Sequence, residues 1–344
     1  MGVAKRAGPV LSARAPAPVI LHSAPLVLPI VTEPIRDGAV AIRGGRVLRA
    51  GPRNELLSRY RVTEEHRWRG TIVAGLVDAY AAGGAPGPGV VARAVELGDP
   101  ATPGTTAHGP ATEVSYVRVT CESEPDWEES LRDALITALH EADRPVGVAA
   151  HTRDPHVLED VALLARTFAL RLLVDLDRYS PAELDESGVL GRHCHAVCAR
   201  PLDPGERKLL RLRGTTVALR PGPGAGEWPV LVEEGNQLAL GTASITDSPQ
   251  APGDVLAFAA AVRARVRELG ARPRGLDRTL VEAATLGGAR ALGMADGPGG
   301  LGALRPGGRA CFAVFDSRGR YPYSALLRGP ACLATVVDGR VHLT

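Results

Sequence analysis

The sequence predicts a (β/α)8 barrel joined to a small β domain that is built from both ends of the chain. In the middle of the chain, short apolar segments of strand length alternate with segments of helical periodicity. Alternating strands and helices are typical of a parallel sheet, and so many repeats favour a closed barrel over the alternative, an open doubly wound sheet. Both ends of the chain instead carry short strands with hairpin turns.

The β-rich ends are expected to pair into one composite domain. Residues 39–43 and 46–49 flank Gly44 and Gly45, a dipeptide typical of a two-residue hairpin turn. Near the other end, the segments at residues 309–316 and 334–343 are again of strand type, the second with a turn at Asp338 and Gly339. The domain boundaries that follow are a loose N-terminal arm at 1–18, a composite β domain from 19–70 and 303–344, and a barrel at 71–302.

The units of the predicted barrel follow in order. Residues 71–79 form a continuous apolar run, as expected for a strand buried on both faces. Further strands are expected at 113–120, 146–150, 170–176, 195–199, 215–219 and 237–241. Helices are expected around 131–139 and 157–168 and at 204–213, 254–268 and 277–292. Asp154 before Pro155, and Ser180 three residues before Glu183, are typical of helix starts.

Composition and charge exclude several classes of protein. Of the 344 residues, 45% are hydrophobic and 23% charged, which is typical of a globular chain. Lys and Arg number 40 against 38 Asp and Glu, and the signs are interspersed, so no surface for nucleic acid is indicated. No apolar run approaches the roughly 18 residues of a membrane span. Five cysteines without framework spacing fit a reducing compartment, and we expect a cytoplasmic protein.

Five segments carry a resemblance to a known family. They lie at residues 36–60, 71–83 (TIVAGLVDAYAAG), 195–221, 233–249 (EEGNQLALGTASITDSP) and 280–316. In this order they resemble the amidohydrolase superfamily, specifically its deaminase and imidazolonepropionase-like branch, near the aminodeoxyfutalosine, guanine and cytosine deaminases. The resemblance implies a metal-dependent TIM-like barrel, a β-sandwich built from both termini, and hydrolysis of non-peptide carbon–nitrogen bonds.

The ligand positions implied by the resemblance are largely replaced. Relatives carry two histidines, two residues apart, at the end of the first barrel strand, where this chain has Tyr80 and Ala82. Side chains two apart on a strand point the same way, so paired imidazoles share one ion, whereas Ala has no donor atom. The remaining positions fall on Asp175, Cys198 and Ala243. Catalytic zinc needs about three protein ligands, so we expect no metal cofactor, the alternative being one divalent metal such as zinc.

Two classes of function remain open at this point. The first is a non-catalytic or divergent member, a pseudoenzyme that binds a small ligand, regulates, or stabilises a partner as a homodimer or beside an active relative. The alternative is a hydrolase acting on non-peptide carbon–nitrogen bonds, such as a deaminase, through a rebuilt site. The candidate catalytic residues are His151, Asp175 and Cys198. Relatives carry a substrate-contacting His at the position of His151, although a histidine on a surface loop would look the same.

The predicted ligand pocket consists of Tyr80, Ala82, His151, Asp175, Cys198 and Ala243. If these residues converge without a metal ion, the carboxylate of Asp175 needs another partner, because a buried lone charge is costly. Three arginines near strand ends are candidates for that partner: Arg178, Arg200 and Arg220.

Overall fold

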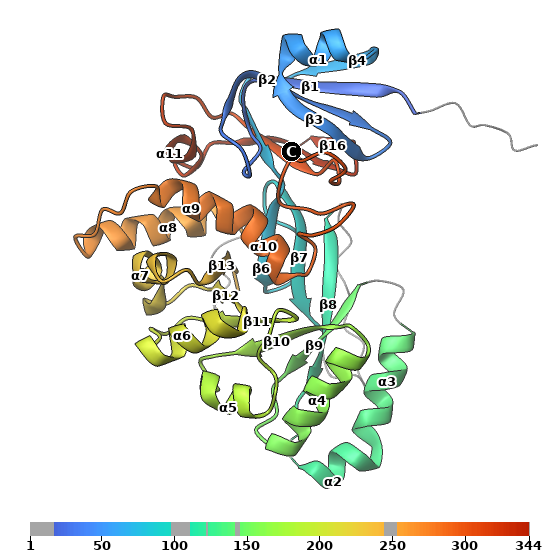
Figure 1. Cartoon of the computed structure of the whole chain (residues 1–344), viewed down its shortest axis with the longest axis vertical. Helices are drawn as coiled ribbons and strands as arrows, with labels where there is room; N and C mark the ends of the chain where they lie inside the picture. Colours follow the sequence, from blue (N-terminus) through green and yellow to red (C-terminus); the bar gives the residue numbers. More distant parts are fainter. Residues whose placement is uncertain (1–16, 98–110, 122, 142–144, 244–252, 344) are drawn as a thin grey trace, which may run out of the picture.

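The structure is a computed structural model that describes residues 17–97, 111–121, 123–141, 145–243 and 253–343. It contains a nearly closed barrel of eight parallel strands and a separate mixed sheet formed by both ends of the chain (Figure 1). The predicted fold class is therefore confirmed. Most of the expected loose arm, residues 1–16, lies outside the described residues.

The barrel strands lie in sequence order around the sheet. They are β6 (Leu76–Ala81), β7 (Val90–Glu96), β8 (Thr112–Val119), β9 (Val146–Ala150), β10 (Arg171–Asp175), β11 (Cys194–Cys198), β12 (Thr216–Leu219) and β13 (Gln237–Leu240). The first and last strands meet where the backbone amide of Ala243 donates to the carbonyl of Tyr80, at 2.9 Å. This contact brings the two ends of the barrel sheet together beside the site described below.

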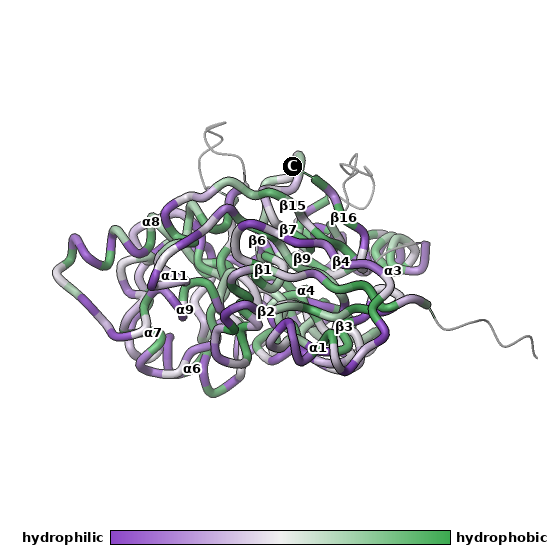
Figure 2. The backbone as a smooth tube through the Cα atoms, turned by 90° about the horizontal axis from the view of Figure 1, so that it is seen from above, coloured by the Kyte–Doolittle hydropathy of each residue, from purple (hydrophilic) through white to green (hydrophobic). Residues whose placement is uncertain are grey.

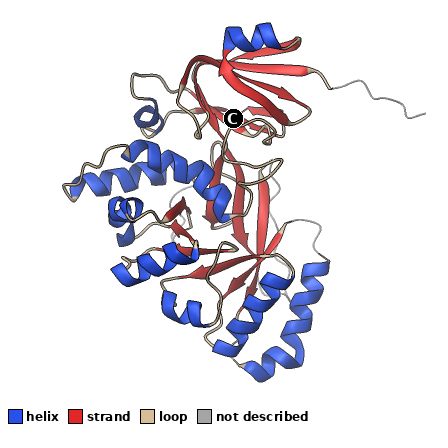
Figure 3. Cartoon of the chain, in the orientation of Figure 1, coloured by secondary structure: helices blue, strands red, loops and turns tan. Residues whose placement is uncertain are grey.

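Helices lie outside the barrel strands (Figure 3). They are α2 (Glu124–Asp126), α3 (Arg132–His140), α4 (Pro155–Thr167), α5 (Pro181–Glu186), α6 (Pro204–Arg213), α7 (Trp228–Glu233), α8 (Val255–Glu268), α9 (Leu276–Glu282) and α10 (Gly288–Ala291). Asp154 caps α4, and Ser180 with Glu183 forms a capping box on α5, as predicted. Outer helices such as α6 and α8 mix hydrophilic and hydrophobic residues along their length, as expected of helices with one face on a core (Figure 2).

Two helices contain a wider turn than their periodicity predicted. π-helical turns at Trp127–Leu131 and Ala283–Gly287 connect α2 to α3 and α9 to α10, and a 3-10 turn at Pro223–Glu227 precedes α7. Gly287 and Gly288 bring the α9–α10 helix close to the barrel. A Cβ atom on Gly287 would lie 2.0 Å from the carbonyl oxygen of Leu238, so a side chain there has no room.

The second sheet joins the two ends of the chain through one central strand. Its order is β16–β15–β14–β5–β1–β2–β3, with β4 also paired to β1. The strands are β1 (Val19–Leu28), β2 (Ile35–Arg43), β3 (Arg46–Pro52), β4 (Val62–Arg67), β5 (Thr71–Ala74), β14 (Phe312–Phe315), β15 (Cys332–Val337) and β16 (Arg340–Leu343), with helices α1 (Arg53–Arg59) and α11 (Pro322–Leu326) beside them. Both predicted hairpin turns are present, with positive φ at Gly44, Gly45, Asp338 and Gly339.

Two sequence predictions need correction. The single strand expected over residues 71–79 is two strands in different sheets, because the chain leaves the mixed sheet after β5 and enters the barrel at β6. Gly75 separates them, at a point where a Cβ atom would lie 2.4 Å from a methyl group of Val91. The strand β7 was not expected at all. No helix within the described residues is long and apolar enough to cross a membrane.

Candidate functional site

The carboxyl ends of the barrel strands bring together several of the predicted pocket residues. Tyr80 lies near the end of β6, His151 directly follows β9, and Asp175 ends β10. In (β/α)8 barrels this face carries the active site, because the loops that follow the strands converge there. The residues form two linked polar clusters, one around Glu96 and one around Asp175.

Glu96, the last residue of β7, is the centre of the first cluster. Its side chain is only 6% exposed. One oxygen accepts a hydrogen bond from the Tyr80 hydroxyl at 3.1 Å, and the other lies 3.0 Å from His151 Nε2. Arg118 of β8 donates from Nε to that second oxygen, also at 3.0 Å. Four strands or their following loops thus contribute to one buried contact.

The contacts of His151 determine where its proton lies. Arg178 Nη1 is 3.3 Å from His151 Nδ1, and a guanidinium can only donate, so Nδ1 is the acceptor. The proton is therefore on Nε2, which donates to Glu96. Burial raises the pKa of Glu96, but the hydrogen bond from His151 and the charge and hydrogen bond of Arg118 outweigh it, so the net pKa lies below its usual value. Glu96 is consequently ionised and holds the imidazole in one orientation.

The second cluster consists of two carboxylates joined by one guanidinium. Arg220, which follows β12, donates from Nη2 to both oxygens of Asp175 at 3.0 and 2.9 Å, and to Asp177 at 2.6 Å. Its side chain is only 6% exposed, and its guanidinium carbon lies 5.9 Å from the centre of the Tyr80 ring. The expectation that Asp175 finds an arginine partner is confirmed, with Arg220 as the main one.

The other two candidate cations take different roles. Arg178 Nε approaches Asp175 only to 3.9 Å, and Arg200 pairs with Glu206 at 2.6 Å. Burial raises the pKa of Asp175, and the charge of Arg220 only partly offsets this. Asp175 thus depends on Arg220 for compensation of its charge.

Cys198, Ala82 and Ala243 do not join these clusters through their side chains. Cys198 is fully buried, and its thiol donates to the carbonyl of Arg200 at 3.2 Å. Burial, with the charge of Asp177 in support, raises the pKa of this thiol to about 12. Ala82 is exposed, and Ala243 contributes its backbone contact to Tyr80. The thiol is therefore protonated and turned to a local carbonyl instead of to a ligand.

The residues present do not fit the metal ion that the fold implies. Asp175 has both oxygens bonded to Arg220, and the thiol of Cys198 is turned to the carbonyl of Arg200. Over the part of the chain that the structure describes, no group of three His, Cys, Asp or Glu side chains could hold an ion. The guanidinium of Arg220 instead supplies the positive charge between these strand ends.

Sequence reasoning missed three residues of the site, Glu96, Arg118 and Asp177. The signal for Glu96 was present, since residues 90–95 (VVARAV) form an apolar run that ends at this carboxylate. The charge of Arg93 interrupts this apolar run, and the stretch before it is rich in Gly and Pro, so the run was not recognised as a strand. In the structure Arg93 is 3% exposed and donates to Glu113 at 2.7 Å, so the charge is buried and paired.

The comparisons with known proteins address the fold. No family model matches the chain, and no curated protein matches it. Among solved structures, it is similar to an adenosine deaminase from Xanthomonas campestris with bound zinc, at a TM-score of 0.75 and 18% identity over 94% of this chain and 93% of that one. The chain has the fold of amidohydrolase-superfamily deaminases and hydrolases.

Two further structures extend this similarity over whole chains. The zinc complex of atrazine chlorohydrolase from Arthrobacter aurescens gives a TM-score of 0.72 at 16% identity, covering 94% of this chain and 95% of the other. Guanine deaminase from E. coli gives a TM-score of 0.71 at 15% identity, covering 96% of this chain and 100% of the other. At these identities the likeness establishes the shared amidohydrolase fold, and function must be argued from the site.

Proposed function

We propose that this protein is a divergent amidohydrolase-superfamily hydrolase that acts on a non-peptide carbon–nitrogen bond of a small molecule, in the manner of a deaminase, without a metal ion. The observation that carries the proposal is the imidazole of His151, held between ionised Glu96 and the guanidinium of Arg178 at the barrel mouth. A base oriented by a buried carboxylate is a recurrent arrangement for proton transfer.

The arrangement supplies the groups that hydrolysis needs. Nδ1 of His151 accepts a proton from water as the water oxygen attacks the carbon that bears the leaving nitrogen. The imidazole then returns this proton to the nitrogen, which departs as ammonia while the carbon keeps the new oxygen. Arg178, whose side chain is 54% exposed, moves off Nδ1 and stabilises the negative charge that develops.

Space for a ligand lies beside Arg178, the residue that contacts this base. A cavity of about 540 Å³ has Arg178 in its wall, together with Arg153 and Tyr179. This volume lies within the range of small-molecule sites. Its wall also carries three glutamates, Glu159, Glu183 and Glu186, so it offers both donors and acceptors to a small polar molecule.

A non-catalytic ligand-binding or partner-stabilising module is the second candidate. It is favoured by the Arg220 cluster, in which one guanidinium already compensates Asp175 and Asp177 without any ligand. Because these charged residues compensate one another without a ligand, their presence is explained by stability alone and does not require a catalytic role. The names of the similar structures, which are deaminases and hydrolases, favour the first candidate.

The test is ammonia release from adenosine, guanine and an aminotriazine by protein treated with a chelator and dialysed. We expect release to persist without metal and to fall at least about 100-fold in His151→Gln. His156→Gln is the matched control, because His156 is exposed on α4. Release that requires one equivalent of metal contradicts the proposal. Binding of a compound without ammonia release supports the non-catalytic module instead.

A further inference from the structure

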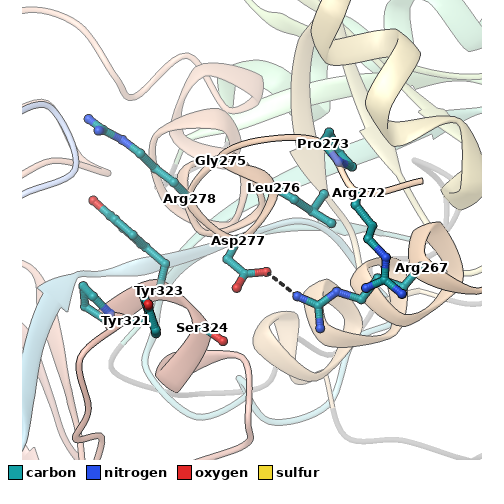
Figure 4. A pocket seen from close by; sticks show the side chains of 11 residues that line it. Arg267, Arg272, Pro273, Gly275, Leu276, Asp277, Arg278, Tyr321, Tyr323 and Ser324 are labelled. Carbon is teal, nitrogen blue, oxygen red and sulfur yellow. Dashed lines mark ion pairs between the residues drawn. The ribbon is translucent and has the colours of Figure 1, made fainter. Parts of the chain in front are cut away.

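A separate cavity of about 390 Å³ lies between the end of α8, the start of α9 and the segment around α11 (Figure 4). It shares no lining residue with the clusters around Glu96 and Asp175. Three arginines line it, Arg267, Arg272 and Arg278, against one carboxylate, Asp277. Its charged wall therefore has a positive excess.

The arginines of this cavity are weakly engaged by the protein itself. Arg267 Nη2 is 3.7 Å from Asp277 Oδ1, which is longer than a hydrogen bond. Arg278 pairs with Glu33, whose side chain is 79% exposed, and such surface pairs contribute little. Within the described ranges, Arg272 has no hydrogen bond or ion pair. The guanidinium groups of Arg267 and Arg272 are therefore available to an anion.

Two buried atoms of the same cavity residues lack hydrogen-bond partners in the described structure. They are the hydroxyl oxygen of Tyr323 and Oδ1 of Asp277. Burial raises the pKa of Tyr323, so its phenol keeps its proton and is a donor. The carboxylate of Asp277 is an acceptor. Buried polar atoms without partners are unusual, and a ligand that both accepts and donates hydrogen bonds would satisfy them.

We propose that this cavity binds a small phosphate monoester that also carries hydroxyl groups, such as a sugar phosphate or a nucleotide. The planar forks of Arg267 and Arg272, which lie on one side of the cavity (Figure 4), match phosphate oxygens in pairs. Asp277 accepts from a ligand hydroxyl, and Tyr323 donates to a ligand oxygen. Figure 4 shows Arg267 and Arg272 on one side of the cavity and Arg278 with the two tyrosines on the other.

The experiment is calorimetric titration of the full chain with ribose 5-phosphate, AMP, inorganic phosphate and ribose. We expect both phosphate esters to bind more tightly than inorganic phosphate, and ribose not to bind. Arg272→Gln should weaken binding of the esters about tenfold, equivalent to about 1.4 kcal/mol, since one charged contact is lost. Arg274→Gln is the matched control, because Arg274 is exposed on the same loop and does not line the cavity.

Each other outcome overturns the proposal or a part of it. Absence of ester binding at up to about 10 mM, the weakest range of interest for a metabolite site, rejects it. Equal weakening by Arg272→Gln and Arg274→Gln shows only general attraction of anions. Inorganic phosphate that binds as tightly as the esters rejects the role of Asp277. Both variants change exposed side chains, and circular dichroism of each verifies folding before titration.

Discussion

Asp78 on β6 is a buried carboxylate whose ionisation should destabilise the folded protein. Asp78 is only 2% exposed. Its Oδ1 accepts hydrogen bonds from the backbone amides of Thr242, at 3.0 Å, and Tyr80, at 3.2 Å. The Thr242 hydroxyl donates to Oδ2 at 2.5 Å. Burial raises the pKa of Asp78 from 3.8 to about 6, against the opposing effect of these hydrogen bonds. A shift of about two units corresponds to about 3 kcal/mol.

The sign of the pH dependence follows from the raised pKa. The folded protein holds the Asp78 proton more tightly than the unfolded chain does. The contribution of this protonated carboxyl to the stability of the fold is therefore fully present below about pH 4 and is lost as pH rises through about 6. Asp78→Asn removes the charge and keeps the shape. Its amide oxygen still accepts from Thr242 and Tyr80, and its NH2 group donates to the Thr242 hydroxyl.

We expect Asp78→Asn to be more stable than the natural protein by up to about 3 kcal/mol at pH 8, with the difference shrinking toward pH 5. Urea unfolding at pH 5, 6, 7 and 8 measures this difference directly. Asp133→Asn, at an exposed position of α3, is the matched control and should show no such trend. A difference that does not vary with pH, or a variant that is less stable at pH 8, refutes the reasoning.

Two further predictions concern packing and charge around the barrel. Arg220→Met should lower the free energy of unfolding by about 3 to 5 kcal/mol at pH 7, because Asp175 and Asp177 lose their buried partner. Urea unfolding measures this loss. A loss under about 1 kcal/mol would show that water compensates the charges of the two carboxylates. Gly287→Ala should lower the melting temperature, because its Cβ atom would lie 2.0 Å from the carbonyl oxygen of Leu238. Gly51→Ala is the control and should leave the melting temperature almost unchanged, because no atom lies nearer than 3.6 Å to its Cβ position. Equal melting temperatures of the two variants would show that the helix can shift outward.

The arrangement of elements could be predicted because its signals are local. Alternating strand and helix patterns, the hairpin glycines Gly44 and Gly45, and the capping residues Asp154 and Ser180 each act within a few positions of the chain. The resemblance then placed Tyr80 and Asp175 at strand ends, and the structure locates both beside the barrel mouth. The need of Asp175 for a cation also followed from the sequence, since a buried carboxylate is costly wherever the chain folds.

The sequence alone determined most of the strand and helix units and their order, and the resemblance implied that Tyr80 and Ala82 stand where relatives carry histidines. Only the tertiary structure decided that residues 71–79 belong to two sheets. A buried strand of the mixed sheet and a buried strand of the barrel have the same apolar sequence pattern, so the pattern does not distinguish them. It also selected Arg220 for Asp175 over Arg178, which is nearer in sequence. Contacts between strand ends depend on how the barrel closes, and no local pattern encodes that closure. For the same reason Glu96, at the end of β7, and His151, directly after β9, meet only in the folded chain, because β8 lies between these strands.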